Sequence, residues 1–367
     1  MLLTAIVFVI ILSILVFIHE LGHFSMARII GVKVEEFGFG LPPRIFGKKF
    51  GKHGTIYSLN WLPIGGFVKL AGEDEAEGTT EKLKGTTKKE YFFARSKKER
   101  AVILLAGVTM NFLLAVGITT YLLTQGIAEV SGHVHVEQVV SGGPAEKAGI
   151  QAKDIIKSVA YQVSGVPNEK SVVTPQDLIG TVKSHAGETI VLTVLRGDQV
   201  LTVSLIPRKE FPAGEGPTGV AISDLETHVY PLNRAPFVAL KINLERAWQM
   251  LAGIWSLIVR IFQWQGVGQD VAGPIGIAQV TGQAVKFGLK AVLEFMSILS
   301  LNLAVLNVLP IPALDGGRLA FVFLEKILGR KVKPAFEQST HQIGMIILFI
   351  LILLISINDI LRLTRGG

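Results

Sequence analysis

Residues 19 to 23 read His-Glu-Leu-Gly-His, and their types and spacing suit metal-dependent hydrolysis. His19 and His23 are four residues apart, so on a helix they project from one face, where two imidazole nitrogens can hold a divalent zinc ion. Glu20 lies on the same surface and can handle the protons of an attacking water molecule. The pattern predicts a zinc hydrolase in which His19 and His23 bind the metal and Glu20 is the catalytic residue.

A third protein ligand is needed if zinc is to keep one position open for water, and Asp315 is the best candidate. Asp315 follows an apolar stretch that contains Pro310 and Pro312, which must break the hydrogen-bond ladder of a helix. Inside a bilayer, backbone groups freed in this way are tolerated only where they face protein or a water-filled cavity. Gly316 and Gly317 let the chain turn closely around the carboxylate. The alternative is that Asp315 and Gly316 form only a surface turn after the helix.

The position of the zinc motif, directly after the apolar run 2–18, strengthens the prediction. Ionisable residues in or beside a membrane-spanning segment are costly and are by default functional. The run lacks the basic start and the small-residue cleavage site of a secretory signal, so we expect a retained membrane helix. A helix end whose polar residues merely face lipid headgroups is the alternative. Solvated or structural roles are expected for the histidines without ligand spacing: His53, His133, His135, His185, His228 and His341.

The chain has 367 residues, of which 49% are hydrophobic, and its mean hydropathy is +0.48. Its apolar residues are concentrated in blocks, and four of these extend to about 20 residues, enough to cross a hydrocarbon core of about 30 Å. We therefore predict a polytopic α-helical membrane protein with about four transmembrane helices, at residues 1–27, 101–124, 290–318 and 342–362. A further stretch, 236–264, carries charges along one side, so we expect an amphipathic interfacial helix; a fifth span is the alternative.

Lysine and arginine are concentrated in two segments, and this predicts the orientation of the spans. One segment is 28–100, expected to form a cytoplasmic or re-entrant β region and a basic loop; the other is the link at 326–333. Both should be cytoplasmic, which leaves the N-terminus, the C-terminus and residues 125–283 outside. The net charge of +7 is thus explained by membrane topology, without a nucleic-acid partner. The absence of cysteine excludes disulfides and thiolate metal ligands.

Residues 128–212 carry the pattern of a small extracytoplasmic α+β domain. Gly149 is expected to end a short helix, and Asp154 to open the turn before a buried strand. Thr174 and Pro175 have the types of an N-cap and a first helical residue, and alternating strands follow at 189–195 and 200–205. The segment resembles a PDZ domain, whose groove takes a peptide as an added strand. A generic small β domain is the alternative.

Taken together, these motifs resemble the bacterial site-2 protease family of intramembrane zinc metalloproteases, in the single-PDZ form of the regulator-of-sigma-E protease type. The match covers nearly the whole chain, including Gly-Pro-Ile-Gly-Ile at 273–277. The resemblance implies one zinc ion per chain, held by His19, His23 and Asp315, with Glu20 as general base. It further implies that Asn307 assists in positioning the substrate.

The resemblance also implies that residues 37–40 and 64–70 belong to a re-entrant β structure near the site. Its glycines then become candidates for substrate binding: Gly38, Gly40, Gly65 and Gly66. An exposed edge at 64–70 would let an unwound substrate pair its backbone groups. One departure appears in the second span, where the sequence from Gly107 to Phe112 lacks the proline that the family often has before Asn-Phe. This difference concerns the local bend of that span.

The expected function is therefore hydrolysis of peptide bonds within transmembrane segments of single-pass membrane proteins, in the bacterial cytoplasmic (inner) membrane. The substrate class expected from the resemblance is an anti-sigma factor or a remnant signal peptide, cut in regulated intramembrane proteolysis. Two rival functions are a metal transporter, which should show repeated halves, and a catalytically silent PDZ adaptor. The sequence shows no repeated halves and contains an intact zinc set, so both rivals are disfavoured. The oligomeric state is left open.

Overall fold

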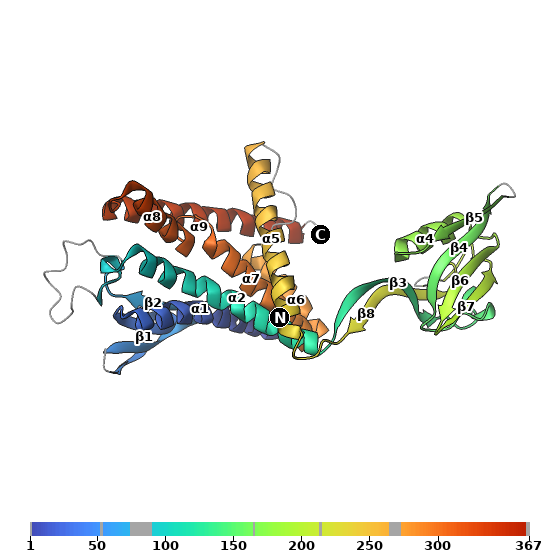
Figure 1. Ribbon diagram of the computed structural model, residues 1–367, viewed down its shortest axis with the longest axis horizontal. Coiled ribbons are helices and arrows are strands. Elements are labelled where there is room, and N and C mark those ends of the chain that lie inside the picture. The colour runs from blue at the N-terminus through green and yellow to red at the C-terminus, as the bar shows by residue number, and fades with distance from the viewer. Residues whose placement is uncertain are drawn as a thin grey trace. The chain divides into compact units, whose positions relative to one another are not determined.

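The computed structural model describes residues 2–51, 54–73, 90–163, 166–212, 215–263 and 273–364. These residues form two compact units: unit 1 comprises Met1–Thr124 with Pro231–Gly367, and unit 2 comprises Gln125–Tyr230 (Figure 1). Most of the predicted basic loop before the second span lies outside the described residues, as do His53 and the last residue of the segment 236–264.

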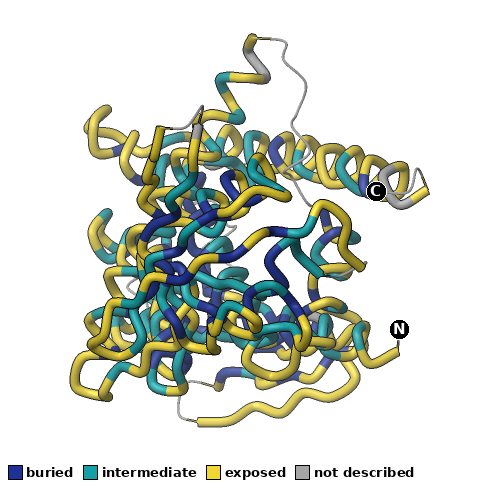
Figure 2. The backbone as a smooth tube through the Cα atoms, turned by 90° about the vertical axis from the view of Figure 1, so that its right-hand side faces the viewer, coloured by how far each residue is buried: buried dark blue, intermediate teal, exposed yellow. Residues whose placement is uncertain are grey.

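Among the described residues, four helices of unit 1 are long and apolar enough to cross a membrane, which confirms the predicted number. They are α1 (Leu2–Ile30), α2 (Lys97–Thr124), α7 (Leu289–Val308) and α9 (Pro334–Thr364). Helix α9 is mostly exposed along its length (Figure 2), as expected for an apolar helix that faces lipid. The long helix α5 (Ala235–Phe262) does not belong to this group of four.

Helix α7 ends at Val308, and a separate helix α8 (Asp315–Leu328) begins at the predicted ligand Asp315. The break between them falls at Pro310 and Pro312, as predicted, because proline cannot donate to the helical ladder. Gly316 is required at the start of α8, since a β-carbon there would lie 1.9 Å from the carbonyl oxygen of Leu309. The predicted third span, 290–318, thus divides into a long helix, a turn and the start of a short helix.

Helix α2 is the centre of unit 1, because it packs against α1, α5, α7 and α8. Its contact with α1 is close: a β-carbon on Gly22 would lie 2.4 Å from the carbonyl oxygen of Ala106. Its contact with α7 includes a hydrogen bond of 2.8 Å from the Ser300 hydroxyl to the carbonyl oxygen of Asn111. Small residues and interhelical hydrogen bonds of this kind hold helices together in lipid, where the hydrophobic effect between helices is weak. Helix α6 (Pro274–Phe287) packs against α1, α7 and α9.

Unit 1 also contains a sheet made of two long strands, β1 (Val34–Phe50) and β2 (Thr55–Leu70). Residues 36–39 pair with 66–69 on one side and with 56–59 on the other. Residues 66–70 therefore form an outer edge of the sheet. The predicted β structure at 37–40 and 64–70 is confirmed, and its re-entry into the bilayer stays a prediction. A short turn of 3-10 helix, Phe92–Ala94, leads into α2.

Unit 2 has one sheet in the order β7-β6-β4-β3-β8, with β5 paired to β4, and two helices. Its elements are β3 (Ile127–Val139), α3 (Pro144–Lys147), β4 (Ile155–Val163), β5 (Val166–Ser171), α4 (Pro175–Ser184), β6 (Ile190–Arg196), β7 (Gln199–Leu205) and β8 (Val220–His228). The predicted short helix, hairpin strands and capped helix are all confirmed. Their apolar side chains form one buried cluster that includes Ile156, Ile190 and Leu192.

Two carboxylates stabilise the turns of unit 2. Asp177 closes a capping box with Thr174 at the start of α4, and hydrogen bonds from the Thr174 hydroxyl and amide lower the pKa of Asp177 to about 2. Burial raises the pKa of Asp154, but hydrogen bonds from the Arg196 guanidinium and the Gln151 amide outweigh it, so its pKa lies below the ordinary value. Both groups are ionised at neutral pH and favour the folded domain there.

Candidate metal centre

The three predicted metal ligands converge in unit 1. His19 and His23 are buried in α1, at 7% and 6% exposure, and their Nε2 atoms lie 3.2 Å apart. The Oδ2 atom of Asp315, at the first residue of α8, lies 2.9 Å from Nε2 of His19 and 3.2 Å from Nε2 of His23. Residues almost 300 positions apart in the sequence therefore form one triangle of ligand atoms.

This triangle fits a zinc ion. In tetrahedral coordination with Zn–N distances of about 2.0–2.1 Å, the ligand atoms are about 3.3 Å apart. The environment of His23 supports the same conclusion, because its Nδ1 faces the carbonyl oxygen of Ile103 at 2.9 Å and so carries the proton. In the neutral ring, Nε2 then presents a lone pair toward His19 and toward the Asp315 carboxylate. Acceptor atoms that converge in this way repel each other unless a cation lies between them.

Glu20 joins the metal centre to the edge of the sheet. Its carboxylate accepts a hydrogen bond of 3.1 Å from the amide of Val68 in β2. The two predicted glycines of this strand lie against α1: a β-carbon on Gly65 would be 3.0 Å from Val16, and one on Gly66 would be 4.0 Å from Cγ of Glu20. The strand edge at 66–70 is therefore adjacent to α1, the helix that carries the predicted ligands His19 and His23.

A second carboxylate covers the same edge. The amide of Leu70, two residues after Val68 and so on the same side of the strand, donates to Glu73 at 3.4 Å. Glu73 also forms an ion pair with Arg318, which follows Asp315 by three residues in α8. The end of β2 is thus tied to the helix that carries Asp315, the third predicted metal ligand. This pair is a contact that the sequence alone did not indicate.

The other predicted glycines lie inside the sheet. A β-carbon on Gly38 would meet the ring of Phe67 at 2.4 Å. Gly40 has φ +79, where a side chain would be strained, and the carbonyl oxygen of Leu62 lies 2.4 Å from the position of its β-carbon. These two residues therefore shape the sheet, while Gly65 and Gly66 contact α1. Asn307 is buried in the last turn of α7, before the turn that leads to Asp315.

His341, for which the sequence predicted a solvated or structural role, supports the turn before Asp315. Its Nδ1 accepts a hydrogen bond of 2.9 Å from the amide of Ala313, a non-glycine residue with φ +76. Helix α9 also packs tightly on this turn, because a β-carbon on Gly344 would lie 2.3 Å from Pro312. A strained backbone persists only where its surroundings hold it, and here α9 supplies that support.

Helix α2 contributes two further residues that the sequence analysis did not assign to the metal centre. A β-carbon on Gly107 would lie 2.4 Å from Nε2 of His23 and 2.8 Å from Cε1 of His19. The side-chain amide of Asn111 lies 3.4 Å from Nδ1 of His19. Ile103, Gly107 and Asn111 are spaced by four residues and so share one helix face. Gly107 and Asn111, a small and a polar residue at this spacing in an apolar span, were the signal available in the sequence.

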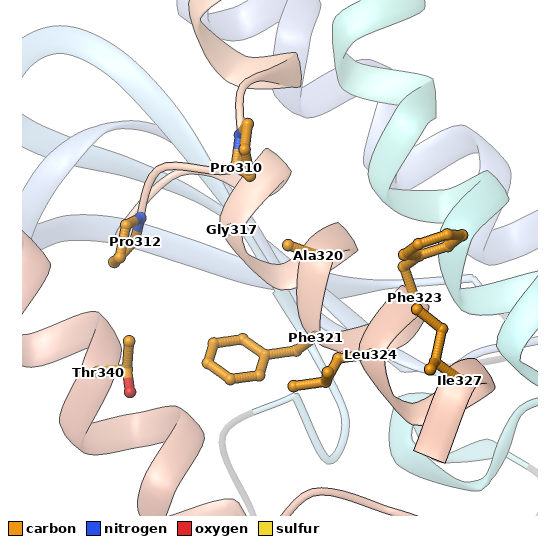
Figure 3. A pocket seen from close by; sticks show the side chains of 9 residues that line it. All are labelled: Pro310, Pro312, Gly317, Ala320, Phe321, Phe323, Leu324, Ile327 and Thr340. Carbon is orange, nitrogen blue, oxygen red and sulfur yellow. The ribbon is translucent and has the colours of Figure 1, made fainter. Parts of the chain in front are cut away.

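A separate apolar cavity of about 370 Å³ lies between the α7–α8 turn, α8 and α9 (Figure 3). Pro310 and Pro312 line it from the turn, Phe321 and Leu324 from α8, and Thr340 from α9. None of the predicted metal ligands lines it, and its walls carry no ionisable group. The cavity is therefore not the place of the hydrolytic chemistry.

A His-His-Asp centre with an adjacent glutamate, whose two histidines are buried in a helix apolar enough to span a membrane, is typical of a membrane-bound zinc metalloprotease. Comparison with protein families agrees, because the model of peptidase family M50 matches residues 7–351. The chain therefore belongs to peptidase family M50, the site-2 protease family.

Individual relatives match over nearly their whole length. The chain is 32% identical to a "Putative zinc metalloprotease" of Rickettsia conorii, covering 97% of this chain and 98% of the relative. It is 31% identical to a protein of the same description in Fusobacterium nucleatum, over 98% and 99% of the two chains. It is 28% identical to the zinc metalloprotease RasP of Bacillus licheniformis, again over 98% and 99%.

Proposed function

We propose that this zinc metalloprotease cleaves peptide bonds within the transmembrane segments of single-pass membrane proteins. The observation that carries the proposal is the triangle of His19, His23 and Asp315, because α1, which carries both histidines, is itself a candidate membrane span. A hydrolytic centre attached to a membrane helix lies where transmembrane substrates are found. Anti-sigma factors and remnant signal peptides, as parts of regulated intramembrane proteolysis, are the substrates that the resemblance favours.

Each side chain of the site has a separate role in the proposed reaction. His19, His23 and Asp315 would hold the zinc ion, which would supply polarisation of the scissile carbonyl group and activation of water. Glu20 takes a proton from the attacking water and passes it to the leaving amine. Asn307, near the turn before Asp315, is proposed to hold the substrate backbone in place by hydrogen bonding.

Elemental analysis tests the assignment of the ligands. Detergent-purified wild-type protein is expected to contain close to one zinc ion per chain, because three ligands leave a single open position. His23→Ala and Asp315→Ala should each contain much less zinc, since either change leaves only two protein ligands. His185→Ala, in unit 2, is the matched control and should keep the metal. Full zinc in Asp315→Ala would show that the third ligand is wrongly assigned.

We further propose that a substrate binds as an added strand along the edge at 66–70. A transmembrane helix must unwind before its peptide bonds can be attacked, and pairing with a strand keeps the freed backbone groups satisfied. Two observations support substrate binding at this edge. The edge adjoins Glu20, and its amides at Val68 and Leu70 point outward to the carboxylates of Glu20 and Glu73. The backbone carbonyl oxygens of an added strand would replace these carboxylates as the acceptors of the two amides.

Disulfide cross-linking tests the added strand, because the chain has no cysteine of its own. Lys69→Cys is combined with Glu20→Gln, which keeps the substrate uncut, and with a series of single cysteines along a model substrate. A strand should give one strong substrate position with weaker ones two residues away, because facing residues alternate between the two faces of a sheet. Moving the cysteine from Lys69 to Phe67 should move that maximum by two residues.

Lys49→Cys, on the far side of the same sheet, is the control and should give no cross-links. Maxima spaced by three or four substrate residues would indicate a bound helix, and would contradict strand addition.

We also propose that unit 2 is an extracytoplasmic PDZ domain that docks or filters substrates, in an inner-membrane protein whose active site lies toward the cytoplasm. The Lys/Arg distribution supports this orientation, and the capped helix α4 beside the sheet of unit 2 supports the domain assignment. Deletion of 128–212 should leave cleavage of a substrate with a short ectodomain and relax the preference against bulky ectodomains. Complete loss of cleavage in a folded, zinc-loaded deletion protein would contradict this division of roles.

A further inference from the structure

Asn111 of α2 is in contact with a predicted zinc ligand. Its side chain is fully buried, and its amide nitrogen lies 3.4 Å from Nδ1 of His19, the ring nitrogen that does not face Asp315. Within the described part of the chain, the amide oxygen of Asn111 has no hydrogen-bond partner. A buried acceptor without a partner is unfavourable, because it has lost its hydrogen bonds to water, so its presence beside a predicted metal ligand calls for an explanation.

The other predicted histidine ligand, His23, shows that the ring nitrogen turned away from the metal needs a hydrogen-bond acceptor. His23 directs Nε2 at the other ligands, and its Nδ1 donates to the carbonyl oxygen of Ile103 at 2.9 Å. A neutral histidine that binds metal through one ring nitrogen carries its proton on the other, and that N–H needs an acceptor. His19 directs Nε2 at the ligand cluster in the same way, so its Nδ1 also carries a proton when the metal is bound.

We propose that Asn111 is the positioning residue for His19, and that its amide oxygen accepts the proton on Nδ1. The nitrogen and oxygen of a side-chain amide exchange places by a half-turn, so this arrangement needs no change of backbone. The half-turn gives the buried oxygen of Asn111 a donor and gives the N–H of His19 an acceptor. The proposal rests on the assignment of His19 as a zinc ligand through Nε2.

Helix α2 then fixes both imidazole rings from one face, through the carbonyl of Ile103 and the side chain of Asn111, with Gly107 leaving room between them. The hydrogen bond from Ser300 to the backbone of Asn111 holds this part of α2 against α7. Loss of such an outer partner of a metal ligand commonly weakens metal binding by about 10- to 100-fold. We expect a loss of that size when the acceptor at position 111 is removed.

The test compares Asn111→Leu and Asn111→Asp in the full-length protein purified in detergent. Leucine keeps most of the volume and removes the acceptor, whereas aspartate keeps an acceptor oxygen and removes the amide donor. Thr119→Val is the matched control, because Thr119 is another buried polar residue of α2 and bonds Asn243 and Ser297 away from the metal centre. The zinc dissociation constant is measured by competition with a chelator, and the visible spectrum of the cobalt(II)-loaded protein reports the ligand geometry.

Zinc binding is expected to be about 10- to 100-fold weaker in Asn111→Leu, with an altered cobalt spectrum, and unchanged or tighter in Asn111→Asp. Thr119→Val should match the wild type. Wild-type affinity in Asn111→Leu would show that the residue only fills space, and weaker zinc binding in Asn111→Asp would show that its donor is what matters; either result overturns the proposal. A wild-type protein that binds no zinc would instead overturn the ligand assignment itself, and the proposal with it.

Discussion

Glu20→Gln is expected to keep its zinc and to lose cleavage of a transmembrane substrate by about 10²- to 10⁴-fold, the usual contribution of a general acid–base residue. Glutamine has nearly the same shape and can still accept the amide of Val68 through its side-chain oxygen. It cannot take a proton from water at neutral pH. The turnover of a purified single-pass substrate in detergent, measured beside the zinc content of the same preparation, checks both parts of this expectation.

Glu73→Gln is the matched control, since Glu73 accepts the amide of Leu70 on the same strand edge but is not in the ligand cluster. Its cleavage rate should fall far less than that of Glu20→Gln. Equal losses in the two variants would mean that Glu20 acts only by holding the strand edge. Loss of zinc from Glu20→Gln would mean that the residue supports the metal rather than the proton transfer.

Gly107→Ala is expected to remove most of the bound zinc and with it the cleavage activity. The added carbon would lie 2.4 Å from Nε2 of His23 and 2.8 Å from Cε1 of His19, inside the contact distance of both ligand rings. The rings must then shift by several tenths of an ångström, whereas ligand distances in zinc sites vary by only about 0.2 Å. Zinc content and the visible spectrum of the cobalt(II)-loaded protein measure this disruption.

Gly117→Ala controls for the general effect of adding a methyl group to α2. Gly117 lies in the same helix, and a β-carbon there would meet nothing within 4 Å. It should therefore keep full zinc and activity, and alanine should if anything favour the helix. A Gly107→Ala protein with wild-type zinc content would show that the rings lie elsewhere in the functional enzyme.

Several features were predictable from the sequence because they depend on local pattern. The number of apolar helices follows from the length of the hydrophobic blocks, because a helix of about 20 apolar residues spans the hydrocarbon core and satisfies its own backbone hydrogen bonds there. His19, Glu20 and His23 share a face because their spacing matches the helical repeat. The break after Val308 follows from the prolines, and the capped helix α4 follows from Thr174 and Pro175.

Other features were not predictable because they join segments that are distant in the sequence. The amide of Val68 donates a hydrogen bond to Glu20. Residues 36–39 pair with 66–69 on one side and with 56–59 on the other. His341 supports the turn at Ala313. No local periodicity specifies such contacts. The short helix α8 was not predicted as a separate element, because its first turn, at residues 315–318, was included in the predicted third span, 290–318.

The sequence by itself therefore determined the class of chemistry, zinc-dependent proteolysis in a membrane setting, and it predicted Glu20 as the base. The tertiary structure decided how that chemistry is held in place. It puts Asp315 within 2.9 Å of His19, and it places the face of α2 with Gly107 and Asn111 against the ligand rings. The physical reason is that residue type limits what a side chain can bind, whereas the precision of a metal site comes from neighbours that only packing brings together.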